Sequence, residues 1–253
     1  IKNIINTNII VIMFKTILRN IIISIGLHNS DAFFNPTIKT SNNKKLTIIG
    51  QGPPFLFSTG LFGIMPSMFY GDFINLIKKN ISVVTIDGFS PITEETIDEV
   101  CEALRVDKIG YLGHSSFFPE VLNNKNIENA ILIDPINLPW INFEGLSNSI
   151  INVNYPMLVI RAGKLYNGSK TLPQWQDPDF RCTIEDITYD DVGHPDILDN
   201  TWANIAKNIG LWEMAETEKM DFKNWKFKVN TEIPKMRKKY RKYVALKIGE
   251  FLD

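Results

Sequence analysis

The sequence KIGYLGHSSF, at residues 108–117, places an apolar run directly before a tight turn. The run from Ile109 to Leu112 has the length and composition of a buried β-strand. The chain then passes through Gly113 and His114 to Ser115, which stands at the apex of the turn. Such a turn strains the backbone at its apex and lifts the serine hydroxyl clear of the sheet edge. The stretch therefore predicts a strand that presents a serine nucleophile.

The neighbours of the serine decide which residue is the apex. Small residues two positions before and after it keep the turn free of clashes, and Gly113 meets this requirement whereas Phe117 does not. With Ser116 at the apex, the flanking residues would be His114 and Phe118, which fit the turn less well. We therefore assign the role of nucleophile to Ser115.

The composition is that of an ordinary globular protein. A chain of 253 residues suits one large α/β domain with its own core, and 44% hydrophobic with 22% charged residues argues against disorder throughout. The net charge of -1 indicates no overall electrostatic attraction to nucleic acid. Two cysteines and three histidines are too few for a disulfide framework or a zinc site. We expect no metal, no cofactor and no nucleic-acid partner.

Residues 1–35 differ from the rest of the chain because they are rich in Ile and Asn, with no acidic residue before Asp31. From Met13 a basic start leads into a short apolar centre, which is the build of a secretory leader. The following Asn29-Ser-Asp-Ala-Phe-Phe34 resembles the Ala-Phe junction of plastid presequences in algae with complex plastids. We weigh two expectations about equally: the segment is a leader that directs the protein to the plastid, or it is an apolar strand or helix packed on the domain. Without such a leader we expect a cytoplasmic or secreted protein.

Strand and helix patterns alternate along residues 36–212, which we predict to be the main domain. Apolar or alternating runs predict strands at 45–49, 55–58, 81–86, 109–112, 130–133, 157–160 and 186–192. Helical spacing predicts helices at 69–79 and from Thr93 to about Leu104. This order predicts an α/β fold with a mostly parallel sheet and helices on both faces.

A glycine-containing loop, Ser58-Thr-Gly-Leu-Phe-Gly63, follows the second of these strands. Glycines let a chain turn so that its N–H groups face an oxyanion. We predict an oxyanion hole formed by the backbone N–H groups of Leu61 and Ser116, with Gly60 in the same loop. Taken alone, the loop would also fit a glycine-rich turn with no ligand.

A serine nucleophile needs a base to take its proton and a carboxylate to orient that base. In hydrolases whose serine stands on such a turn after a strand, these groups occur in the chain order serine, acid, histidine. His194 is the only histidine after Ser115, so it is the predicted base. Asp134, at the carboxyl end of the 130–133 strand, is the predicted acid, although an Asp-Pro pair also opens turns. Asp190 and Asp191 lie too close to His194 along the chain to serve.

The segment 136–155 follows the predicted acid and is rich in apolar residues. This composition suits a lid over a hydrophobic substrate. A loop that buries its aromatic side chains in the core would have the same composition, and we give the two explanations nearly equal weight. The residues that we predict to contact substrate are Phe62, His114, Phe117, Leu138 and Trp140.

Residues 213–253 are predicted to be a basic helical extension, since lysines and arginines dominate from Lys219 to Lys247 with aromatics among them. Such a segment could dock on an anionic membrane or partner. A solvated amphipathic helix packed on the body explains the same charges, and charge runs usually have that explanation.

Five motifs together resemble the α/β-hydrolase superfamily: Gly50-Gln-Gly-Pro-Pro, Ser58-Thr-Gly-Leu-Phe, Gly113-His-Ser-Ser, Ile133-Asp-Pro-Ile and Gly193-His. The resemblance covers about residues 40–212. Gly-His-Ser followed by an Asp-Pro strand end is similar to chlorophyllases and platelet-activating-factor acetylhydrolases. It implies a triad of Ser115, Asp134 and His194 that cleaves an ester of a long hydrophobic alcohol without a metal.

The sequence departs from that family's pattern at three points. The family's Gly-His-Ser-x-Gly-Gly is Gly-His-Ser-Ser-Phe-Phe here, its oxyanion-loop His-Gly is Thr59-Gly60, and the interval from serine to acid is shorter than in plant chlorophyllases. Separately, many α/β-hydrolases carry their acid after the strand that corresponds to 157–160, and here that position reads Gly163-Lys-Leu-Tyr166, with no carboxylate. Two alternatives therefore stay open: an inactive scaffold with a hydrolase fold, and an acyltransferase on the same fold.

Overall fold

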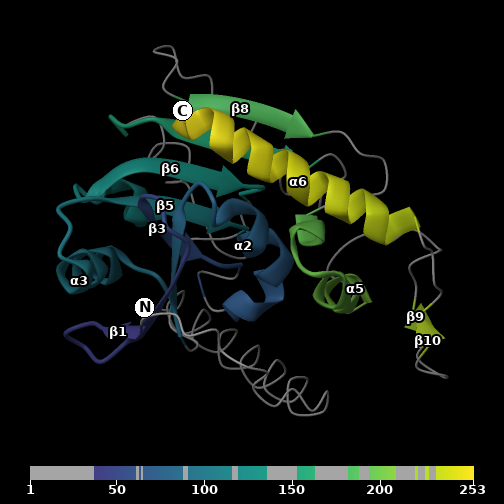
Figure 1. Ribbon diagram of the computed structural model, residues 1–253, viewed down its shortest axis with the longest axis horizontal. Helices are drawn as coiled ribbons and strands as arrows, with labels where there is room; N and C mark the ends of the chain where they lie inside the picture. The colour runs from purple at the N-terminus through teal and green to yellow at the C-terminus, as the bar shows by residue number, and fades with distance from the viewer. Residues whose placement is uncertain are drawn as a thin grey trace, which may run out of the picture.

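A sheet of eight strands organises the molecule (Figure 1). The computed structural model describes residues 37–60, 63, 65–87, 91–115, 119–135, 153–162, 182–187, 194–208, 220–221, 226–227 and 232–253. The strands of the sheet are β1 (Thr37–Lys39), β2 (Lys45–Ile49), β3 (Pro54–Ser58), β4 (Ser82–Ile86), β5 (Ile109–His114), β6 (Ile127–Ile133), β7 (Met157–Ala162) and β8 (Cys182–Ile187).

The strand order is β1-β2-β4-β3-β5-β6-β7-β8. The pairs β1–β2 and β2–β4 are antiparallel, and every pair from β4 to β8 is parallel. Residue Gly110 lets β5 pack closely on β3, because a Cβ there would lie 2.5 Å from the Phe55 ring. Because these strands run parallel, the carboxyl ends of β3, β5, β6 and β7 lie at one edge of the sheet, where α/β proteins place their ligands.

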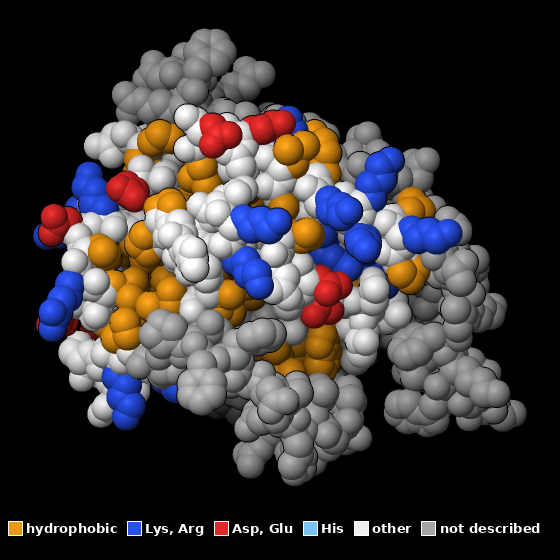
Figure 2. Space-filling model, in the orientation of Figure 1, with side chains coloured by type: hydrophobic (Ala, Val, Ile, Leu, Met, Phe, Trp, Pro, Cys, Tyr) orange, Lys and Arg blue, Asp and Glu red, His pale blue; other side chains and the backbone are white. Residues whose placement is uncertain are grey.

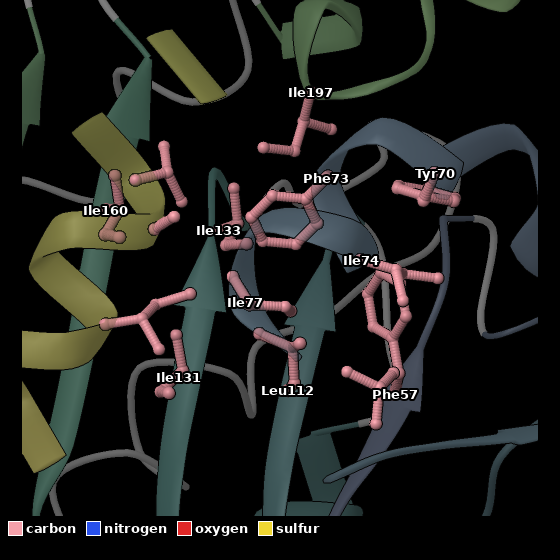
Figure 3. Close-up of a cluster of buried hydrophobic side chains, with 14 of the residues drawn as sticks. Phe57, Tyr70, Phe73, Ile74, Ile77, Leu112, Ile131, Ile133, Ile160 and Ile197 are labelled. Atoms are coloured by element: carbon pink, nitrogen blue, oxygen red, sulfur yellow. The ribbon is translucent and has the colours of Figure 1, made fainter. Parts of the chain in front are cut away.

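Alternate residues of the central strands face two separate cores, as the two-residue repeat of a strand requires. Leu112, Ile131 and Leu158 belong to one cluster, whereas Leu132 and Val159 belong to the other. Figure 3 shows the first cluster, in which strand side chains meet those of a helix. Helices α2 (Gly71–Ile77) and α6 (Glu232–Leu252) cover that face, and α3 (Glu94–Leu104) covers the other. The predicted fold class is thus confirmed.

Most predicted elements agree with the structure, and two of them differ. The helix predicted at 69–79 is a 3-10 turn, η1 (Ser67–Tyr70), which runs directly into α2. The strand predicted at 186–192 begins earlier, because β8 spans Cys182–Ile187. Residues 188–193 lie outside the described part of the chain, as do the predicted leader at 1–35 and the core of the predicted lid at 136–152.

The C-terminal helix α6 packs on the body of the domain. Its residues Tyr240, Val244 and Ile248 are fully buried in the cluster that also holds α2. Two short antiparallel strands, β9 (Met220–Asp221) and β10 (Lys226–Phe227), precede it where only helix was expected. Within the predicted extension at 213–253, α6 thus agrees with the expectation of a helix packed on the body.

Lysines lie along the outer side of α6, and Figure 2 shows basic side chains over that part of the surface. Lys235, Lys238, Lys239 and Lys242 are exposed. Arg237 and Arg241 are buried, so they are not part of any basic surface. Within the described residues, no helix is both long and apolar enough to cross a membrane. Docking of α6 on an anionic membrane surface stays a prediction.

Candidate active site

Ser115 lies just beyond the end of β5 in a strained backbone conformation. Its φ is +68°, in the left-handed region that L residues other than Asn and Asp rarely adopt. Its backbone N–H donates to the Ile133 carbonyl at 3.1 Å, which ties the turn to β6. Gly113 keeps the turn tight, because a Cβ there would lie 3.1 Å from the Tyr111 ring and 3.3 Å from Leu132. This is the strained turn that the sequence predicted around Ser115.

The structure brings Ser115, His194 and Asp134 together at the carboxyl edge of the sheet. The Oγ of Ser115 lies 2.9 Å from Nε2 of His194. On the other side of the ring, Nδ1 of His194 is hydrogen-bonded to Oδ2 of Asp134. All three side chains are buried, and the Asp134 carboxyl is fully so. Residues separated by 79 and 60 positions in the chain thus meet in one row.

Two strand ends and one short turn supply these groups. Asp134 follows β6 directly, and its backbone N–H bonds to the Ile160 carbonyl of β7 at 2.5 Å. Its φ of +43° falls in a region that aspartate tolerates better than most residues. His194 begins the 3-10 turn η4 (His194–Ile197), which leads toward α5 (Asn200–Asn208). The side chains therefore approach one another from separate elements.

The hydrogen-bond partners determine where the protons lie. An ionised Asp134 carboxylate only accepts, so Nδ1 of His194 carries the proton that is donated to it. The Nε2 lone pair then faces the Ser115 hydroxyl, which donates to it. A histidine in this tautomer can take the serine proton while the carboxylate stabilises the imidazolium that results.

A second histidine, His114, lies directly beside the first. The two imidazole rings stack with their centroids 4.7 Å apart and an interplanar angle of 23°. Nε2 of His114 lies 3.2 Å from the backbone carbonyl oxygen of His194, and Nδ1 lies 2.8 Å from the Tyr70 hydroxyl. A carbonyl only accepts, so Nε2 of His114 donates and Nδ1 accepts from Tyr70.

The chain of hydrogen bonds continues into the loop after β3. The Gly60 N–H donates to the Tyr70 oxygen at 2.8 Å. Burial lowers the pKa of His114 well below 6.5, and the neighbouring His194 lowers it further. Burial likewise raises the pKa of the Tyr70 hydroxyl. Both groups are therefore neutral at pH 7, as the direction of these hydrogen bonds requires.

Two predicted site residues thus have partners that differ from those expected. Gly60 was expected in the oxyanion hole, but its N–H is already donated to Tyr70. His114 was expected to contact substrate, but it is 3% exposed and both ring nitrogens have protein partners. Sequence reasoning missed Tyr70 because it lies in an apolar helical pattern, where one hydroxyl carries no distinguishing signal.

The other predicted site residues lie outside the described part of the chain. They are Leu61, Phe62, Ser116, Phe117, Leu138 and Trp140, and the same holds for Asp190 and Asp191. Among the residues that the structure does describe, no three His, Cys, Asp or Glu side chains are grouped to hold a metal ion.

Comparison with known proteins gives likenesses of structure only. No family model and no curated protein matches the sequence. A predicted CIB-like hydrolase from Thermoplasma acidophilum is 14% identical with a TM-score of 0.48, and the match covers 71% of this chain and 98% of that one. A meta-cleavage product hydrolase from Pseudomonas fluorescens IP01 is 12% identical with a TM-score of 0.47, covering 68% and 92%. Naproxen esterase from Bacillus subtilis is 11% identical with a TM-score of 0.46, and the match covers 66% of this chain and 87% of that one.

The chain has the α/β-hydrolase fold. Its mostly parallel sheet carries helices on both faces, and a strained serine follows the central strand β5. Asp134 and His194 come later in the chain, and serine, aspartate, histidine is the chain order that this fold uses.

Proposed function

We propose that this protein is a serine hydrolase that cleaves carboxylic esters. The observation that carries the proposal is the 2.9 Å contact between Ser115 Oγ and His194 Nε2, on a ring whose other nitrogen is bonded to Asp134. The strained φ of +68° at Ser115 adds support, because such strain persists only where the surrounding structure enforces it.

In the proposed reaction, the Ser115 oxygen attacks the ester carbonyl while Nε2 of His194 takes its proton. Asp134 holds the ring and stabilises its positive charge. The protonated His194 then gives its proton to the departing alcohol, which leaves an acyl-serine. Water attacks this acyl group with His194 again as the base, releasing the acid and restoring the Ser115 hydroxyl.

The tetrahedral intermediate needs donors for its negative oxygen. We propose the backbone N–H groups of Leu61 and Ser116, each contributing about 3 kcal/mol in a typical oxyanion hole. Gly60 contributes indirectly, because its bond to Tyr70 holds the start of that loop. The short bond of 2.7 Å from the Gly63 N–H to the Thr59 carbonyl supports the same loop.

The proposed substrate is an ester with a long hydrophobic part, such as a chlorophyll-like or lipid ester. The support comes from the sequence, in which the apolar segment 136–155 follows the acid Asp134 directly. An apolar site takes up such a group by removing it from water, at about 25 cal/mol per Å² of apolar surface.

A fluorophosphonate probe tests the proposal, because it reacts only with an activated serine. We expect the wild-type protein to be labelled and Ser115→Ala to lose labelling, together with a fall in ester hydrolysis of about 10⁴-fold or more. Ser67→Ala, a partly exposed serine at the start of η1, is the matched control and should be labelled like the wild type.

A panel of short acyl esters, lipid esters and chlorophyll then identifies the substrate class. Higher kcat/KM for the long hydrophobic esters is the expected result. A folded wild-type protein that the probe does not label would refute the hydrolase and favour a scaffold on the same fold.

A further inference from the structure

Helix α6 carries two buried arginines that the proposed reaction does not use. Arg237 is 1% exposed and Arg241 is 2% exposed, although both lie in a helix whose lysines are on the surface. Burying a guanidinium group is costly unless it is paired and hydrogen-bonded. Their partners therefore indicate what the helix does.

The partners of Arg237 lie immediately after His194. Nε of Arg237 donates to Oδ1 of Asp196 at 2.5 Å, and Nη1 donates to Oδ1 of Asn204 at 2.7 Å. Asp196 is fully buried and stands two residues after His194, in the same 3-10 turn. One planar guanidinium thus joins η4 to α5 and fixes the direction of both contacts.

Arg241, one helical turn further along α6, holds the next residues. Its Nη1 donates to the Leu198 carbonyl at 2.7 Å, and its Nη2 donates to Oδ2 of Asp72 at 3.0 Å. The Asp72 backbone N–H in turn donates to Oδ1 of Asp199 at 2.8 Å. The segment from His194 to Asp199 is therefore anchored at successive points to α6 and α2.

A third residue of α6, Tyr240, is buried between Arg237 and Arg241 along the helix. Tyr240 is fully buried, and its pKa is raised by burial and then by the carboxylates of Asp134 and Asp196. The inner face of α6 contacts η4, the turn that carries His194, and reaches the Asp196 carboxylate through Arg237.

The turn that carries His194 cannot hold its own orientation. A single 3-10 turn has few and poorly aligned backbone hydrogen bonds. Yet the imidazole must face Ser115 and Asp134 at the same time, and a displacement of about 1 Å in such an arrangement can cost about 100-fold in rate. Contacts from outside the turn have to supply that precision: one is the bond from His114 Nε2 to the His194 carbonyl, and the others come from α6.

We propose that Arg237 and Arg241 are positioning residues that fix the 194–199 segment so that the His194 imidazole meets both Ser115 and Asp134. This inference rests on the function proposed above. An apolar pair would hold the helix against the domain at no greater cost, since buried ion pairs are often replaceable without loss of stability. The ion pairs differ from such packing in fixing the direction of the turn.

The test uses the double variant Asp196→Asn with Arg237→Gln, which removes both charges and leaves neither buried alone. The matched control is Lys238→Gln, which removes the same charge from an exposed position next to Arg237. Proton NMR reads the geometry directly, because a histidine Nδ1 proton in a bond to a buried carboxylate is shifted far downfield, and we expect such a signal from His194. With only three histidines in the chain, His194→Gln assigns that signal.

We expect the double variant to remain folded by thermal melting and to lose the downfield signal. The rate of fluorophosphonate labelling at Ser115 and kcat should both fall by about 100-fold, with KM changed by less than about twofold. Lys238→Gln should match the wild type in all of these. If the double variant does not fold, Arg237→Lys takes its place. Lysine keeps the positive charge but lacks the planar set of N–H donors of a guanidinium, so we expect the labelling rate to fall about tenfold.

A folded variant that keeps the wild-type signal and labelling rate would overturn the proposal, and so would a wild-type protein without the downfield signal. The NMR readout also separates this inference from the proposed function. If the wild type is not labelled and hydrolyses no ester, the function fails, whereas loss of the signal in the double variant would still establish the positioning role.

Discussion

The two stacked histidines of the site have the same side chain, the same depth of burial and opposite surroundings. His194 faces a hydroxyl on one nitrogen and a carboxylate on the other. His114, 4.7 Å away, faces a tyrosine hydroxyl and a backbone carbonyl. A carboxylate can offset the positive charge of an imidazolium, and of the two rings only that of His194 is bonded to one.

The difference shows that partners, and not the residue type, decide which histidine can act as a base. Burial lowers the pKa of His114, and no carboxylate partner raises it again. Its Nδ1 lone pair is also occupied by the Tyr70 hydroxyl. His114 is therefore suited to holding Gly60, Tyr70 and the His194 backbone in one arrangement. The partners of each histidine can be removed separately to test this contrast.

Removing the partner of His194 should have the largest effect. Asp134→Asn is expected to lower kcat by about 10⁴-fold, because an amide no longer selects the tautomer whose Nε2 accepts the serine proton. Asparagine also tolerates the φ of +43° at this position, so the fold should survive. Ester hydrolysis and thermal melting measure the two effects. Asp190→Asn and Asp191→Asn serve as controls. A comparable loss of activity in Asp190→Asn would identify Asp190, and not Asp134, as the carboxylate that acts with His194.

Removing the partner of His114 should affect stability more than catalysis. Tyr70→Phe keeps the edge-on contact with Phe57 at 5.0 Å but leaves the Gly60 N–H and the His114 Nδ1 without a partner. Each unsatisfied buried group costs about 1–3 kcal/mol, so urea unfolding should show a loss in that range or somewhat above it.

The matched control for this change is Tyr155→Phe. The Tyr155 hydroxyl donates to the Leu122 carbonyl at 2.7 Å within the core on the other face of the sheet. Both variants should be destabilised, and only Tyr70→Phe should also lower kcat, by about tenfold or less. Equal activity in the two variants would limit the Tyr70–His114 pair to a structural role.

The smallest effect is expected in the dependence of stability on pH. The unfolded chain binds a proton on His114 near pH 6.5, whereas the folded chain does so only at much lower pH. Between these values the unfolded state holds more protons, so stability falls as the pH drops below 6.5, by about 1.4 kcal/mol per pH unit. Above pH 6.5 this contribution is fully present. Urea unfolding between about pH 5 and 7.5 measures it.

His114→Gln should remove this part of the slope, since glutamine does not titrate. The comparison with wild type cancels the contributions of the other acidic groups. Parallel pH profiles for the two proteins would contradict the assignment of His114 as a buried neutral histidine.

Short-range pattern was enough to predict the fold class and the turn at Ser115. Strand length, the alternation of apolar residues and the glycine at 113 act over a few neighbouring residues, so they are readable in the sequence. Chain order added His194, the only histidine after Ser115, and the resemblance to α/β-hydrolases implied Asp134 as the acid. The structure places all three side chains in one hydrogen-bonded row.

Other features of the site were decided only by the tertiary structure. Tyr70 and His114 are 44 positions apart, and Arg237 and Asp196 are 41 apart. In the sequence, Tyr70 reads as part of an apolar helix, and Arg237 reads as one charge in a basic run. Whether a hydroxyl or a guanidinium faces water or a buried partner depends on how α2, η4 and α6 pack against the sheet, and no pattern of neighbouring residues encodes that packing. The sequence by itself thus determined which groups could react, and the packing decided what holds them in place.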